Sequence, residues 1–121
     1  MDSPRVALIR RLFELTETDD VAAATEELLR HSAEDVVFYP QPAHGQAIHG
    51  HEALRDFWSR FADEGREIRA GVYSITEDGD TVVVTGWVRT MEEGRLADTQ
   101  SRWVYRFDDE GKIVSAGVER A

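Results

Sequence analysis

The spacing of apolar residues at the start of the chain predicts an α-helix. Apolar side chains recur at intervals of three or four residues, as at Ile9, Leu12 and Phe13, and this is the spacing of one helix face. The dipeptide Ser3-Pro4 precedes the run, and these residue types favour the cap and the first turn of a helix. We therefore predict a helix over residues 4–16.

The same spacing predicts two further helices. The first covers about residues 21–31, and we place Glu26, Glu27 and Arg30 on its polar, outward face. The second covers residues 52–62, and its apolar stripe consists of Ala53, Leu54, Phe57, Trp58 and Phe61. We expect both helices to pack their apolar faces against a core.

The rest of the chain has the short apolar runs of β-strands. Turns rich in Asp, Glu and Gly separate them, and Pro40 and Pro42 end the first run. The predicted strands cover residues 35–39, 47–49, 66–76, 81–90, 95–107 and 112–120. Strands joined by short turns pair as an antiparallel meander, and helices followed by a meander are typical of an α+β fold. Because no repeat or linker divides the chain, we expect residues 1–121 to form a single domain.

The predicted strand 95–107 has two chemically different faces. Trp103, Tyr105 and Phe107 share one parity, and we expect them to face the helices. Arg102 and Arg106 have the other parity, so we expect them on the outer face of the sheet.

The predicted strand 81–90 is apolar on both faces. Val82 and Val84 lie on one side of it, and Val83 and Trp87 lie on the other. A second apolar face needs a cover, and in a chain of 121 residues another subunit can provide it. We therefore predict a homodimer that forms through the outer face of the sheet.

The charge balance narrows the range of partners. The chain has 24 Asp and Glu against 14 Lys and Arg, and its formal net charge is −10. We expect no nucleic-acid partner and no anionic membrane surface, because both bind through basic residues. The absence of cysteine excludes disulfides, thiolate nucleophiles and Cys-ligated metals.

The basic residues and the first residues also suggest a source and a compartment. All basic residues except Lys112 are Arg, which we interpret as a sign of a GC-rich, bacterial coding sequence. Residues 1–4 carry an acid where a signal peptide needs a base, and no apolar run has the length of a membrane span. We therefore expect a cytoplasmic protein.

Three short motifs carry a family resemblance. They are the strand entry Asp35-Val36-Val37-Phe38, the helix start Gly50-His51-Glu52-Ala53-Leu54, and the final turn Asp108-Asp109-Glu110-Gly111-Lys112. In this order and spacing they resemble the nuclear transport factor 2-like superfamily, in particular its SnoaL-like and ketosteroid-isomerase-like branch, over nearly the whole chain. The resemblance implies a cone-like, curved antiparallel sheet that is wrapped round three helices and has a pocket at its open end.

The catalytic groups that the resemblance implies are replaced in this chain. Ketosteroid isomerases use an Asp before the proline that ends the first strand, a Tyr on the first helix and an Asp on a late strand. These positions correspond to Tyr39, Leu12 and Trp103. The final-strand carboxylate of limonene-epoxide-hydrolase-like members falls near Val118. SnoaL-type cyclases keep an acid deep in the pocket, and the long strands place none on their inward faces.

The residues left for a ligand site are mostly aromatic. We predict a pocket lined by Leu12, Trp58, Trp103 and Phe107. Tyr39 would act as proton donor, because a Tyr hydroxyl is ordinarily protonated at neutral pH, and His49 would act as general base at the rim. The alternative is that the aromatic residues form an ordinary core and that Tyr39 only satisfies its hydroxyl.

Two other polar features are weaker candidates. His44, His49 and His51 suggest a metal, but the expected acidic ligand does not follow, and His51 is better placed to cap a helix. We predict no metal and no cofactor. Arg89 lies two positions from Trp87; we expect it to stack on the indole, and the alternative is that it holds a ligand carboxylate.

These observations leave two classes of function open. The first is a SnoaL-like pocket protein that binds a small apolar molecule, as a cofactor-free isomerase, cyclase or lyase if it is an enzyme. The second is a non-catalytic binding or assembly domain. An inward carboxylate or a contact between a His and an acid would favour catalysis, whereas a dry aromatic core would favour assembly.

Overall fold

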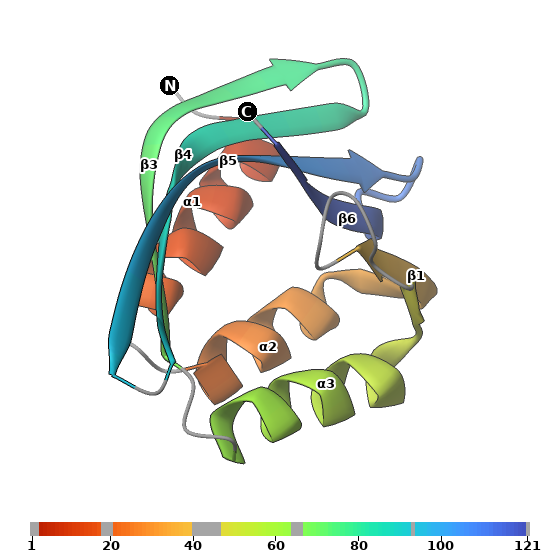
Figure 1. Cartoon of the computed structure of the whole chain (residues 1–121). Helices are drawn as coiled ribbons and strands as arrows, with labels where there is room; N and C mark the ends of the chain where they lie inside the picture. The colour runs from red at the N-terminus through yellow and green to blue at the C-terminus, as the bar shows by residue number, and fades with distance from the viewer. Residues whose placement is uncertain (1–2, 18–20, 40–46, 64–66, 93, 121) are drawn as a thin grey trace.

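The structure is a computed structural model that describes residues 3–17, 21–39, 47–63, 67–92 and 94–120. Three helices and a curved sheet form the α+β fold that the sequence predicts (Figure 1). The helices are α1 (Pro4–Glu17), α2 (Val21–Arg30) and α3 (His51–Asp63). The strands are β1 (Ser32–Tyr39), β2 (Ile48–His49), β3 (Glu67–Asp78), β4 (Thr81–Glu92), β5 (Arg95–Phe107) and β6 (Ile113–Arg120).

The helices begin and end close to the predicted residues. The Ser3 hydroxyl accepts a hydrogen bond from the Val6 amide at 3.2 Å, which confirms Ser3 as the cap of α1. α2 ends at Arg30, one residue before the predicted end, and the His31 amide closes its last turn on the Leu28 carbonyl at 3.2 Å. The predicted break at residues 18–20 and loop at residues 41–45 lie outside the described residues.

All six strands belong to one open sheet in the order β2-β1-β6-β5-β4-β3. Antiparallel pairs join β3, β4, β5 and β6 into the predicted meander. β1 pairs with β6 in parallel, so the sheet is mixed rather than wholly antiparallel. The parallel pairing differs from the predicted antiparallel sheet because β1 and β6 are not neighbours in the chain. No hairpin joins them, since α3 and the strands of the meander lie between them.

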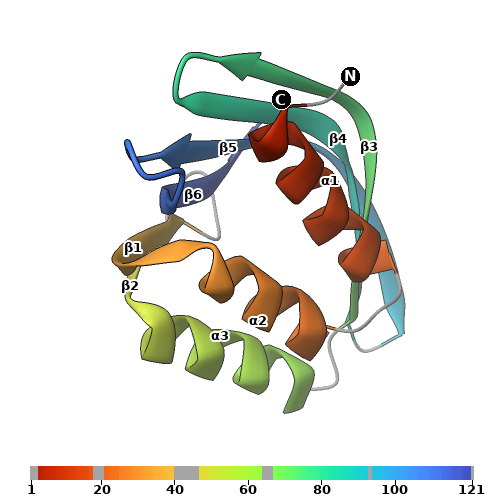
Figure 2. The same cartoon turned by 180° about the vertical axis from the view of Figure 1, so that it is seen from behind.

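The sheet curves around the helices (Figure 1). Viewed from behind (Figure 2), α1 crosses the sheet formed by β3, β4 and β5, and α2 lies between α1 and α3. The inner face carries the core: Val82, Val84 and Ile113 are fully buried on the strands, as are Ile9 and Leu54 on the helices. None of the three described helices lies over the outer face in either view.

The turn between β5 and β6 has the chemistry that its sequence indicates. Asp108 Oδ1 accepts hydrogen bonds from the amides of Glu110 and Lys112, both at 2.9 Å. Gly111 has a φ of 81°, which a residue with a side chain rarely adopts. The acidic turn between β5 and β6 is thus a structural loop.

None of the helices among the described residues is long and apolar enough to span a bilayer.

Candidate functional site

The inner face of β5 is an aromatic surface against α1. Trp103 and Tyr105 both contact Phe13 edge to face, with ring centroids 4.9 Å and 6.4 Å away. Such perpendicular contacts match the edge of one ring to the face of another. The alternation in the sequence therefore predicted this face correctly.

The structure brings the four predicted pocket-lining residues into one cluster. Leu12, Trp103 and Phe107 are buried members of the core, and Trp58 is partly buried against it. Trp58 reaches the cluster through Phe38 on β1, whose ring centroid lies 5.9 Å away. At the last residue of β5, the Arg5 guanidinium lies over the Phe107 ring, 5.4 Å from its centroid. Whether these residues contact a ligand stays a prediction.

Tyr105 is a polar side chain within this aromatic surface. Its neighbours across the sheet, Val82 and Ala116, are 0% and 1% exposed, whereas Tyr105 is 9% exposed. Burial among apolar groups raises the pKa of the Tyr105 hydroxyl far above its ordinary value, so the hydroxyl stays protonated. The sequence placed Tyr105 on the inner face but gave it no role.

The predicted proton donor and base lie on the other side of the sheet. The side chain of Tyr39 is next in sequence to buried Phe38 and points to the outer face, where it is 44% exposed. Its ring lies over Gly117, so a Cβ at that glycine would be 3.1 Å from Tyr39 Cβ. His49 pairs with Val37 and shares this face. Tyr39 and His49 therefore share a face with each other but not with Trp103 and Phe107.

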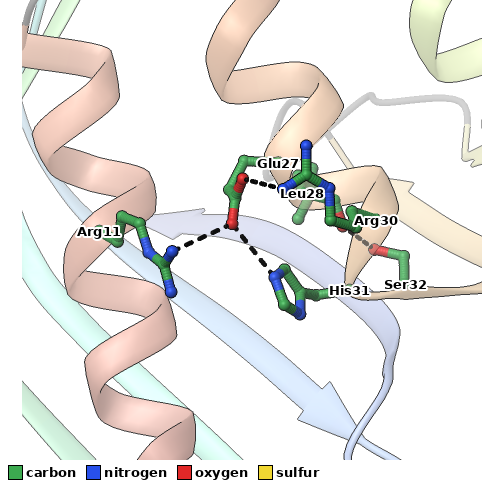
Figure 3. A network of polar contacts seen from close by, with 6 residues as sticks. All are labelled: Arg11, Glu27, Leu28, Arg30, His31 and Ser32. Atoms are coloured by element: carbon green, nitrogen blue, oxygen red, sulfur yellow. Dashed lines mark hydrogen bonds and ion pairs between the residues drawn. The ribbon is translucent and has the colours of Figure 1, made fainter.

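A polar network between α1 and α2 was not predicted. Glu27 is buried, and its carboxylate contacts three groups: it forms ion pairs with Nη1 of Arg11 at 3.5 Å and Nη1 of Arg30 at 3.2 Å, and it lies 3.1 Å from Nε2 of His31. Figure 3 shows all three side chains pointing toward the carboxylate, with Arg11 coming from α1. The Glu27 side chain is 11% exposed and that of His31 is 38% exposed, so an acid and a partly open imidazole are held in contact.

The prediction that Glu27 lies on the outward face of α2 is wrong. Glu26 and Glu27 are about 100° apart around the helix, and only Glu26 is exposed. Glu27 turns toward α1 because Arg11 there compensates its charge. The four-residue spacing of Glu27 and His31, both within the helix predicted over residues 21–31, was the available sign of this contact.

Arg89 adopts the arrangement that we expected for a surface residue. Its guanidinium lies 5.8 Å from the centroid of the Trp87 ring. Two hydrogen bonds, at 2.8 and 3.1 Å, also join it to the Asp98 carboxylate. They lower the pKa of Asp98 and raise that of Arg89. Arg89 is thus committed to an intramolecular partner.

The histidines form no metal set within the described part of the chain. No group of three His, Cys, Asp or Glu residues able to hold a metal is found there. His51 is the first residue of α3, and its Nε2 donates to the Ala33 carbonyl at 3.0 Å, which ties the start of α3 to β1. His44 lies outside the described residues.

Comparison with protein families gives one match over most of the chain. A family model described as a SnoaL-like domain matches residues 9–116. No curated protein matches the sequence.

Solved structures share the fold at low sequence identity. An NTF2-like protein of unknown function from Burkholderia pseudomallei is 23% identical with a TM-score of 0.82, over 99% of this chain and 92% of that one. TerC, co-crystallised with polyporic acid, is 21% identical with a TM-score of 0.80, over 98% and 92%. A putative SnoaL-like polyketide cyclase from Jannaschia sp. CCS1 is 18% identical with a TM-score of 0.78, over 98% and 88%.

Proposed function

The chain belongs to the SnoaL-like domain family, and on that premise we propose that it binds a small, largely apolar, cyclic molecule between its aromatic inner sheet face and its helices. The observation that carries the proposal is the cluster of Leu12, Trp58, Trp103 and Phe107 on that side of the sheet. Rigid aromatic groups favour flat, apolar ligands.

The co-crystal of TerC with polyporic acid supports the same class of ligand. Polyporic acid is an aromatic hydroxyquinone, so it combines flat apolar surface with acceptor oxygens. The described inner face of the central strands offers the matching chemistry, since Tyr105 is polar and Trp103 and Phe107 are aromatic. We therefore extend the proposal to aromatic compounds that carry few polar groups.

If the protein is an enzyme, we propose cofactor-free acid–base chemistry of the isomerase, cyclase or lyase type. Contact between buried Glu27 and His31 supports catalysis over a purely structural role, because a carboxylate that accepts from one ring nitrogen orients the imidazole as a base. Tyr39 as proton donor and His49 as base remain the other possible pair. The non-catalytic binding or assembly domain is the alternative function.

We also propose that the protein is a homodimer formed through the outer sheet face. The large apolar side chains that stay exposed in the described residues are Tyr39, Tyr73, Met91 and Leu96. Each lies on the outer face: Met91 and Leu96 pair with each other and have the parity of Trp87, and the Tyr73 hydroxyl reaches Gln100, which pairs with Trp87. Apolar side chains that stay exposed on one face of a sheet support an interface there. We further expect a bacterial, cytoplasmic protein without a cofactor.

The test is to recover the ligand. We expect native mass spectrometry of the protein purified from its source organism to show a bound small molecule that is absent from Trp103→Ala. Polyporic acid is the probe for protein purified without ligand, and it should quench tryptophan fluorescence of the wild type. Tyr73→Phe is the matched control on the outer face. No retained ligand and no binding of polyporic acid would refute the pocket.

Turnover of the recovered ligand then separates the catalytic pairs. Loss in His31→Gln and Glu27→Gln would support the α2 pair, and loss in Tyr39→Phe and His49→Gln would support the outer pair. Unchanged ligand in the presence of wild-type protein would support the non-catalytic alternative.

A further inference from the structure

We infer that the Tyr105 hydroxyl is the hydrogen-bond donor that anchors an acceptor oxygen, a ketone or quinone carbonyl, of the ligand inside the fold. The inference rests on the proposed function and names the group that gives the apolar site its specificity.

The first step is that the Tyr105 hydroxyl has no hydrogen-bond partner within the described part of the chain. Its hydroxyl makes no hydrogen bond to any described group, although Tyr105 lies in the core. Among the described residues, however, no side-chain N or O atom is both sealed from solvent and without a partner. The hydroxyl oxygen of Tyr105 is therefore not completely sealed from solvent.

The second step locates the exposed part of Tyr105. The backbone end of Tyr105 is closed, because Val82 and Ala116 on either side are 0% and 1% exposed. The remaining exposure of 9% thus belongs to the far end of the ring, which points from the sheet toward the helices. Phe38 and Trp103 retain 9% and 8% exposure on the same face. Phe13 of α1 lies on the same side, with its ring centroid 6.4 Å from that of Tyr105.

The third step concerns the protonation state. Burial raises the pKa of Tyr105, so the hydroxyl donates and does not ionise at neutral pH. In a low-dielectric site such a donor favours a ligand oxygen over bare hydrocarbon, because an unmet polar group is costly there. A carbonyl oxygen is the acceptor that suits a single neutral donor.

The alternatives on the molecule are weaker. The Glu27 carboxylate already contacts the guanidinium groups of Arg11 and Arg30 and the imidazole of His31, and Arg89 is paired with Asp98. Tyr39 and Tyr73 are exposed on the outer face. Tyr105 is the described tyrosine that combines deep burial with an available donor.

The experiment compares two ligands in two proteins. 1-Tetralone has one carbonyl, and tetralin has the same bicyclic carbon skeleton without it. We expect the wild type to bind 1-tetralone about 2- to 13-fold more tightly than tetralin, as one net hydrogen bond allows, by chemical-shift titration. In Tyr105→Phe we expect equal affinities, whereas Tyr73→Phe should keep the wild-type preference.

Fold integrity is checked in the same variants. Because the hydroxyl has no protein partner, Tyr105→Phe should not lower the melting temperature. An unchanged preference for 1-tetralone in Tyr105→Phe would overturn the inference, whether or not the melting temperature of the variant is lowered. If neither compound and no polyporic acid binds the wild type, the proposed pocket itself fails; if they bind but Tyr105→Phe discriminates as before, only the role of Tyr105 fails.

Discussion

Glu27 of α2 and His31, the residue directly after that helix, are in contact, with the carboxylate Oε1 3.1 Å from the imidazole Nε2. The contact is held from two helices, because Arg11 of α1 also reaches Glu27 Oε1, at 3.5 Å. A buried carboxylate that joins α1 to α2 contributes both to packing and to the orientation of an imidazole.

Replacing Glu27 should destabilise the fold more than replacing its neighbour. Glu27→Gln removes a charge that is 11% exposed and faces two Arg side chains and one His side chain. We expect the free energy of unfolding to fall by about 1–3 kcal/mol in urea denaturation. Glu26→Gln is the matched control, because its side chain is 53% exposed, and it should change stability little. Equal losses in the two variants would contradict a special role for Glu27.

Adding a methyl group at Gly71 should displace an indole. A Cβ there would overlap the Trp87 ring on the outer face. We expect Gly71→Ala to lower the free energy of unfolding by about 1–3 kcal/mol, as overpacking does, and to shift the emission of Trp87. The penalty should largely disappear in a Trp87→Ala background, and its persistence there would show that the strain lies in the backbone.

The pH response of Asp98 should depend on Arg89. Hydrogen bonds from the guanidinium lower the pKa of Asp98 in the folded state. The pair therefore stabilises the fold above the ordinary Asp pKa of about 3.9, and this contribution is lost as the pH falls through the lower folded value. We expect NMR titration to show a higher pKa for Asp98 in Arg89→Gln, whereas Arg106→Gln should leave it in place. An unchanged pKa in Arg89→Gln would exclude the pair in solution.

A charge on the outer face should dissociate the proposed dimer. Leu96 is 60% exposed beside Met91, and Leu96→Asp would place a carboxylate in the apolar contact. We expect sedimentation of the wild type to give twice 13.7 kDa and that of Leu96→Asp to give 13.7 kDa. Ala53→Asp, on the exposed side of α3, is the control and should stay dimeric. A wild type that sediments at 13.7 kDa would refute the dimer.

The sequence specified the sheet better than the site. Strict alternation along β5 identified Trp103 and Phe107 as inward, because a residue and its second neighbour must share a face. The same rule applied at Tyr39 would have placed it opposite buried Phe38, on the outer face. We instead placed Tyr39 in the pocket, because the family resemblance marks the position before Pro40 as catalytic.

Features that depend on contacts between distant residues were out of reach. Apart from the four-residue spacing of Glu27 and His31, the polar face of α2 gave no indication that Glu27 turns inward, since that depends on Arg11 in another helix. The parallel pairing of β1 with β6 likewise depends on the path of the whole chain. The local order of apolar and polar residues indicates which side of a helix or strand is apolar. It does not indicate which polar group has a buried partner.

The parallel pair of β1 and β6 also governs how the chain can be assembled during synthesis. β6 is the only strand hydrogen-bonded to both β1 and β5 within the described sheet. Until the ribosome has released β6, the segment β2-β1 and the segment β5-β4-β3 have no backbone link to each other. Closing so long a loop late is entropically costly and slows folding. A nascent chain that stalls before β6 would therefore expose two open strand edges, where chaperone binding or premature aggregation begins.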